Sequence, residues 1–128
     1  MKPFRENIEQ HTRTNTFFRK VLFTGAHSQL VVMSLLPGEE IPRETHPSVD
    51  QFFRIEQGNG KAIINGEEYT LAPEIALIVP AGSEHTIINS GEESMKLYTV
   101  YSPANHPPGT VHETKEDAVR AEKRDTVE

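Results

Sequence analysis

The sequence predicts an all-β protein that forms one small antiparallel barrel or sandwich. Its apolar residues come in short runs of strand length separated by turn residues, which is the pattern of all-β domains. Two turns, Gly58-Asn59-Gly60 and Asn65-Gly66, lie close enough together to fix a meander of three antiparallel strands. A length of 128 residues corresponds to about one domain with a single core.

The expected strands follow the chain from residue 16 to residue 101. Pro37-Gly38 ends the second strand, and Pro107-Pro108-Gly109 excludes regular structure after the last one. The polar segment Thr114-Lys115-Glu116-Asp117 is typical of a helix N-terminus and predicts a short helix through about Lys123. The expected strands cover residues 16–23, 29–36, 51–57, 61–64, 67–71, 75–79, 84–88 and 96–101. The chain then divides into an N-terminal arm (1–15), a barrel (16–103) and a C-terminal loop with a short helix (104–128).

Charge and composition exclude several classes of partner. The chain has 19 acidic and 13 basic residues and a formal net charge of -6, so phosphate backbones and anionic lipid surfaces would repel it. We therefore expect no nucleic-acid partner and no membrane partner. There is no cysteine, so a transition-metal site has to use imidazole, carboxylate or amide oxygen. The N-terminus is charged and has no apolar run, so we expect a cytoplasmic protein.

Four side chains are candidate metal ligands. Glu44 and His46 are two residues apart, so they share a face if this segment is extended. Gln51 opens the next strand, and His85 follows the tight turn Pro80-Ala81-Gly82, which sends the chain back across the same cavity. The sequence therefore predicts that these oxygen and nitrogen donors converge at one end of the barrel.

Strand alternation also predicts which residues line the cavity. Gln51, Phe53 and Ile55 share one face of their strand, and His85 shares a face with Ile87. On the last strand a tyrosine is expected to face the cavity, and we assign Tyr98 to this place, with its neighbour Tyr101 as the alternative. Histidines outside the motifs are expected to be solvated. These are His11, His27, His106 and His112.

The two ligand-bearing segments resemble the two motifs of the cupin family. The first motif reads Gly38-(five residues)-Glu44-Thr45-His46-(four residues)-Gln51-(six residues)-Gly58, and the second reads Pro80-Ala81-Gly82-Ser83-Glu84-His85-(three residues)-Asn89. The resemblance implies a double-stranded β-helix, or jelly-roll barrel, that is usually dimeric and binds one divalent metal ion in its mouth. The identity of the ion stays open among manganese, iron, nickel and zinc.

The chain departs from the usual family pattern at three positions. Glu44 stands where cupins usually have the first histidine, Gln51 where they usually have glutamate, and Glu74 where the second motif usually opens with glycine. Glu44 keeps a ligand, whereas Gln51 is a weaker donor that either binds the ion or orients a residue that does. Similar small cupins that act on unsaturated uronates also look as if they use glutamine here. A pair of hydrogen-bonded histidines without metal is the alternative to the metal site as a whole.

Three functions are compatible with such a site. The first is Lewis-acid isomerase, tautomerase or lyase chemistry on a sugar or another small oxygenated acid. The second is a non-haem iron dioxygenase, because Glu44, His46 and His85 form a two-histidine, one-carboxylate set. The third is a non-catalytic binding or sensor protein for a small molecule. We also expect a homodimer, because residues 16–23 are apolar on both faces and would leave an exposed edge.

Overall fold

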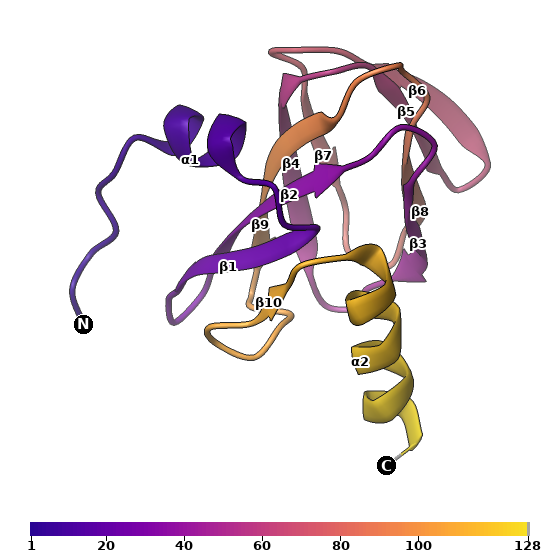
Figure 1. Cartoon of the computed structure of the whole chain (residues 1–128). Helices are drawn as coiled ribbons and strands as arrows, with labels where there is room; N and C mark the ends of the chain where they lie inside the picture. The colour runs from indigo at the N-terminus through magenta and orange to yellow at the C-terminus, as the bar shows by residue number, and fades with distance from the viewer. Residues whose placement is uncertain (128) are drawn as a thin grey trace.

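The computed structural model describes residues 1–127 and confirms the all-β fold. Two antiparallel sheets face each other and enclose the core, and a helix lies outside the sheets near each end of the chain (Figure 1). The elements are α1 (Ile8–Thr14), β1 (Arg19–Thr24), β2 (Gln29–Leu35), β3 (Glu40–Thr45), β4 (Asp50–Gln57), β5 (Gly60–Ile64), β6 (Glu67–Leu71), β7 (Ala76–Val79), β8 (Glu84–Asn89), β9 (Met95–Ser102), β10 (Val111–His112) and α2 (Lys115–Val127).

The two sheets differ in size. The larger has the strand order β10-β1-β2-β9-β4-β7, and the smaller has the order β3-β8-β5-β6. All eight predicted strands are present, with ends shifted by a few residues. The sequence did not predict α1, β10 or the pairing of β3 as a strand. No helix among residues 1–127 combines the length and the apolar character that a membrane crossing needs.

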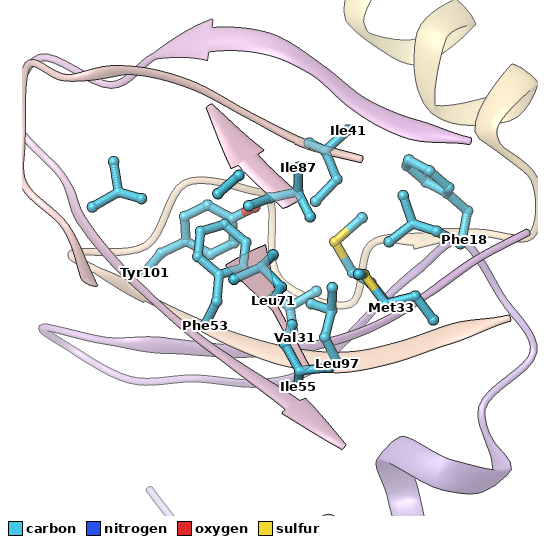
Figure 2. Packing of buried hydrophobic residues seen from close by; sticks show 14 of the residues in the cluster. Phe18, Val31, Met33, Ile41, Phe53, Ile55, Leu71, Ile87, Leu97 and Tyr101 are labelled. Atoms are coloured by element: carbon cyan, nitrogen blue, oxygen red, sulfur yellow. The ribbon is translucent and has the colours of Figure 1, made fainter. Parts of the chain in front are cut away.

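The alternation predicted for β4 is confirmed. Phe53 and Ile55 are buried, whereas Phe52 and Arg54 on the opposite face are only half-buried. β4 lies between β9 and β7, so its inward side chains meet those of β9, with Phe53 opposite Thr99. Figure 2 shows the inward side chains of both sheets packed together in one apolar core. Burial of this apolar surface drives the closure of the barrel.

The predicted tight hairpin between β5 and β6 is also confirmed. Asn65 has φ 49° and Gly66 has φ 84°, so both central residues of the turn have the positive φ that such a turn requires. Asn65 further accepts a hydrogen bond at Oδ1 from the Glu84 amide, 3.0 Å away, which ties this hairpin to the start of β8.

The first strand begins later than predicted, at Arg19 and not at Thr16. The Asn15 side chain forms hydrogen bonds with the amide and the carbonyl oxygen of Phe17, and this local turn precedes the strand. The Phe17 carbonyl oxygen also accepts a hydrogen bond from the Ser34 amide of β2. Within the described residues, β10 pairs with β1 opposite Arg19 and Lys20. That end of β1 is therefore covered, so the free edge on which the dimer prediction rested is shorter than expected.

Side-chain caps begin both helices. Asn7 accepts a hydrogen bond from the amide of Gln10 and starts α1 inside the predicted N-terminal arm. At the start of α2, Thr114 Oγ1 accepts from the Asp117 amide, and the Asp117 carboxylate accepts from the Thr114 amide. The predicted start of α2 is confirmed, and the helix continues beyond the predicted end at Lys123.

Candidate metal centre

A β-bulge in β3 aims Glu44 into the barrel. Ile41 pairs with Ile87 and Glu44 pairs with His85, with one extra residue inserted between these two pairs. Regular pairing would place Arg43 opposite His85. The bulge instead turns Glu44 to the inside, and it lies next to Pro42, which cannot donate a hydrogen bond to the ladder.

Two hydrogen bonds hold the two ligand-bearing loops together. The carbonyl oxygen of His46 accepts a hydrogen bond from the Gly82 amide at 2.8 Å. The Asp50 carboxylate accepts from the Ala81 amide, also at 2.8 Å. The loop after β3 is thus fixed to the turn before β8, and this brings His46 close to His85.

The four predicted ligands converge on one point. Nε2 of His46 lies 3.2 Å from Oε1 of Glu44, and Nε2 of His85 lies 3.8 Å from the same oxygen. The donor atoms of Glu44, His46 and His85 all lie within 4.8 Å of one another. Oε1 of Gln51 lies 3.2 Å from Nε2 of His85. The structure therefore brings together all of the residues that the sequence singled out as candidate ligands.

Hydrogen bonds outside the cluster decide which atoms face it. The Nδ1 nitrogen of His85 lies 3.0 Å from the Ser83 carbonyl oxygen, which can only accept, so Nδ1 carries the proton. In a neutral ring the lone pair is then on Nε2, inside the site. Gln51 donates from Nε2 to Thr99 Oγ1 at 3.0 Å, which turns the amide oxygen toward His85.

This arrangement fits a divalent cation. In the neutral state, Nε2 of His85 and Oε1 of Gln51 are both acceptors, so they face each other without a proton between them. Nε2 of His46 is buried, and its ion-pair contact with Oε1 of Glu44, 3.2 Å away, lies outside hydrogen-bond geometry, so this nitrogen makes no hydrogen bond within the described part of the chain. Two ligand atoms about 2.1 Å from one ion lie about 3.0–3.4 Å apart. The Glu44–His46 and Gln51–His85 spacings of 3.2 Å agree with this range, and the Glu44–His85 spacing of 3.8 Å is longer. A metal ion bound by these groups would accept the lone pairs that have no hydrogen-bond donor within the site.

The charges around Glu44 keep it ionised. Burial raises the pKa of the carboxyl group, but the close contact with His46 and its charge, together with the charges of Arg19 and His85, outweigh burial and lower the pKa below its usual value. Glu44 is therefore a carboxylate near neutral pH, which is the form that binds a metal ion.

The predicted cavity-lining residues divide into two groups. Phe53, Ile55 and Ile87 point inward and are buried, and the Phe53 ring centre lies 6.4 Å from that of His85. Tyr98 differs from the prediction, because it lies on the outer face of β9 with its ring 6.0 Å from Phe52. The inward tyrosine is Tyr101.

Tyr101 was the alternative assignment, and the pairing of β9 with β4 explains its position. It pairs with Gln51, is 1% exposed, and its ring centre lies 5.9 Å from that of His46. The two tyrosines are three residues apart and so occupy opposite faces, but the sequence alone did not say which face is inside. Only the register against Gln51 decides this.

Two histidines that we expected to be solvated pack against the barrel, and one of them, His106, contacts Tyr101 beside the site. His106 places Nε2 3.2 Å from the Tyr101 hydroxyl, with the two ring centres 5.1 Å apart. His112 places Nδ1 3.3 Å from Nη1 of Arg19, whose side chain is 1% exposed. The loop between β9 and α2 therefore folds back over the barrel mouth, and no local sequence pattern indicates this.

The metal-free protein is expected to lose stability in mild acid through His106. Burial, and to a smaller extent the charge of Arg19, lower the pKa of His106 from 6.5 to about 3. Below pH 6.5 the unfolded chain takes up a proton that the folded chain refuses, so the free energy of unfolding falls as the pH drops toward 3. Urea denaturation of a His106→Gln variant should show a flatter pH dependence over this range. The same change at the exposed His27 should leave the slope unaltered, and equal slopes for wild type and His106→Gln would contradict the prediction.

Truncation of Gln51 is expected to weaken the metal site without abolishing it. Its amide oxygen points at the cluster but is a neutral donor, so we expect Gln51→Ala to lower metal affinity by about 10–100-fold. Competition against a fluorescent chelator measures this change. Thr99→Val, which removes only the hydrogen bond that orients the amide, should have a smaller effect. Wild-type affinity in Gln51→Ala would exclude a role for the amide.

The family model for the cupin domain matches residues 31–101, which include both ligand-bearing segments. The chain is a cupin. The Bacillus subtilis protein YrkC is 50% identical over 128 aligned positions, covering 94% of this chain and 68% of YrkC. The crystal structure of BH2720 from Bacillus halodurans has a TM-score of 0.91 and 41% identity, covering 93% of this cupin and 95% of BH2720.

A more distant relative has a named activity. The 5-nitrosalicylic acid 1,2-dioxygenase of a Bradyrhizobium species is 32% identical over 68 residues, which cover 53% of this cupin and 32% of that enzyme. The similarity is confined to part of each chain.

Proposed function

We propose that this cupin binds one divalent metal ion through Glu44, His46 and His85, with Gln51 beside it, and presents the ion to a small oxygenated ligand. The observation that carries the proposal is the convergence of three donor atoms within 4.8 Å around a buried imidazole nitrogen without a hydrogen-bond partner in the described residues. Imidazole and carboxylate donors suit manganese, iron, nickel and zinc. A sugar or an organic acid would be the ligand.

Lewis-acid chemistry is the leading reaction class. When bound, the ion supplies Lewis acidity toward a carbonyl or enediolate oxygen. One carboxylate and neutral donors leave a formal charge of about +1 at the site, and an octahedral ion would keep two positions for the ligand. These properties support isomerase, tautomerase or lyase chemistry.

Tyr101 is the candidate hydrogen-bond donor for a ligand bound at this site. Burial raises the pKa of its hydroxyl well above 10, so Oη keeps its proton at neutral pH. His106 Nε2 lies 3.2 Å away and can hold the hydroxyl in place. Tyr101 is buried with its ring next to that of His46, so its hydroxyl is shielded from water.

A dioxygenase is the second candidate. The set Glu44, His46 and His85 has the composition of the two-histidine, one-carboxylate triad of non-haem iron oxygenases. The partial similarity to a 1,2-dioxygenase supports the same assignment. Both candidates use the same three ligands and differ in the metal and in the requirement for oxygen.

Elemental analysis followed by an oxygen measurement distinguishes these functions. The protein is purified without chelator or affinity metal, analysed, and then reconstituted separately with manganese, iron, nickel and zinc. Oxygen consumption only with ferrous iron and an aromatic or organic-acid substrate would favour the dioxygenase. Turnover without oxygen would favour Lewis-acid chemistry, and a ligand that raises the melting temperature without turnover would favour a binding protein. A protein that retains no metal under any of these conditions would refute the metal site.

We further propose that the cupin is a cytoplasmic homodimer. The outer face of the large sheet carries Phe52 and Tyr98 in contact, with Ile78 64% exposed on the edge strand β7. An apolar sheet face and an open edge favour association with a second copy. Light scattering at several concentrations should give twice the monomer mass, and a concentration-independent monomer would contradict the proposal.

A further inference from the structure

A buried glutamine lies in the same row of the large sheet as two residues of the candidate metal centre. Gln29 of β2 pairs with Tyr101 of β9, and Tyr101 pairs in turn with Gln51 of β4. Residues opposite one another on neighbouring strands point to the same face of a sheet, so the three side chains share the inner face. Each of them is no more than 1% exposed. Gln29 is therefore separated from the candidate ligand Gln51 only by Tyr101.

The Gln29 side chain uses all of its hydrogen-bonding capacity, and three of its four bonds go to one loop. Its Nε2 donates to Thr24 Oγ1 at 2.9 Å and to the His106 carbonyl oxygen at 2.7 Å. Its Oε1 accepts from the amide of Asn105 at 3.1 Å and from the amide of His106 at 3.0 Å. A carboxamide has two N–H donors and two acceptor lone pairs, so every one of them is used. Gln29 thus docks the loop that joins β9 to β10 (Figure 1).

The same loop is also fixed at its far end. The Thr110 carbonyl oxygen accepts a hydrogen bond from the Val21 amide of β1 at 2.9 Å, and Thr110 Oγ1 donates to the Pro107 carbonyl oxygen at 2.6 Å. Pro107 and Pro108 restrict the backbone between the two attachments. The backbone of His106 is therefore held at a defined place against the barrel.

The docked loop brings His106 onto the Tyr101 hydroxyl. His106 Nε2 lies 3.2 Å from Tyr101 Oη, and the two rings meet edge to face with their centres 5.1 Å apart. On its other side the Tyr101 ring lies 5.9 Å from the ring of His46, a candidate metal ligand. A continuous series of contacts leads from Gln29 through His106 and Tyr101 to the metal centre.

We propose that Gln29 is a positioning residue of the ligand site, which docks residues 105–106 so that His106 holds the Tyr101 hydroxyl ready to bind a ligand on the metal ion. This inference rests on the proposed metal function. A hydroxyl that is held in place before the ligand arrives loses less freedom on binding, so the ligand binds more tightly. Gln29 acts through His106 and Tyr101 and does not touch the ligand itself.

The alternative is a purely structural role, in which Gln29 only pairs buried backbone groups and fastens the loop. Gln29→Met leaves those groups unpaired, so it lowers the melting temperature under either role. Only the positioning role also predicts that the folded, metal-loaded variant binds ligand more weakly. It further predicts that this weakening disappears when the Tyr101 hydroxyl is already absent.

Isothermal titration of the metal-loaded protein with oxalate, malonate and catechol tests the proposal, because each probe can present two oxygen atoms to one ion. For the probe that binds most tightly, we expect Gln29→Met to lower the affinity by about 3–10-fold at unchanged metal content, as the loss of one hydrogen bond does. His106→Phe keeps a ring and the backbone groups that Gln29 binds but removes Nε2, so it should lower the affinity by a similar factor.

The Tyr101→Phe background distinguishes positioning from stability. Neither Gln29→Met nor His106→Phe should lower the affinity further in this background, because residues that act through one group have non-additive effects. Tyr98→Phe removes a hydroxyl from the outer face of the same strand and should bind the probe like the wild type.

Metal analysis of every sample separates failure of this inference from failure of the metal site. A wild type without metal, or a metal-loaded wild type that binds none of the three probes, refutes the proposed function. If the wild type binds a probe and folded Gln29→Met binds it equally well, the role of Gln29 alone is overturned. Equal losses with and without the Tyr101 hydroxyl overturn it too. If Gln29→Met does not fold, His106→Phe decides in its place, because wild-type affinity overturns the inference and a loss confined to protein with Tyr101 supports it.

Discussion

The double variant His46→Ala, His85→Ala is expected to purify without the metal that the wild type retains. These residues supply two of the three donor atoms that lie within 4.8 Å of one another, and the remaining carboxylate is partly exposed. One carboxylate and one neutral amide cannot hold a transition metal against water. We expect the loss of metal affinity to be far larger than the loss of about 10–100-fold that follows the removal of a residue that only orients a ligand. Elemental analysis of both proteins measures it.

A histidine outside the cluster provides the matched control. His27→Ala removes one exposed imidazole and should leave the metal content at the wild-type value. Circular dichroism should show the β-sheet signal in both variants, because the substitutions leave the cluster of buried apolar side chains intact. Wild-type metal content in a folded double variant would mean that the metal binds elsewhere on the protein.

Gly60→Ala is expected to have the largest effect on stability. A Cβ atom at this position would clash with the backbone oxygen of Ile88, 2.3 Å away, and with Cε of Met95, 2.2 Å away. The methionine side chain can move, but Ile88 belongs to β8 and is held by the pairing of β8 with β5. Overpacking of this kind lowers the free energy of unfolding by about 1–3 kcal/mol. In a domain of this size the melting temperature should fall by roughly 10 °C.

Gly66→Ala separates this steric effect from the effect of backbone conformation. Gly66 has φ 84°, but nothing lies within 4 Å of the place where a Cβ atom would stand, so only the conformational cost of about 1 kcal/mol applies. We expect a smaller drop in melting temperature for Gly66→Ala than for Gly60→Ala. Equal drops, measured by calorimetry, would mean that β5 and β8 separate easily at Gly60.

Local patterns in the sequence were sufficient for most of the fold. Alternation placed Phe53 and Ile55 inside, and Asn65-Gly66 fixed a hairpin, because both depend on neighbours along the chain. The helix α1 was missed because its seven residues are short and polar, and its only cap signal is Asn7. The short strand β10 has no signal of its own, since it forms only against β1.

The sequence alone determined the all-β class, eight of the ten strands found in residues 1–127 and the identity of the four candidate ligands. This was possible because turn residues, side-chain alternation and the spacing within each motif can all be recognised in short segments of the chain. The tertiary structure decided which tyrosine faces the site and that Arg19 lies inside the barrel. It also decided that Glu44, and not Arg43, points at His85, through a bulge that exists only in the pairing of β3 with β8. Register, bulges and long-range burial depend on residues far apart in the chain, so they become visible only when the barrel is closed.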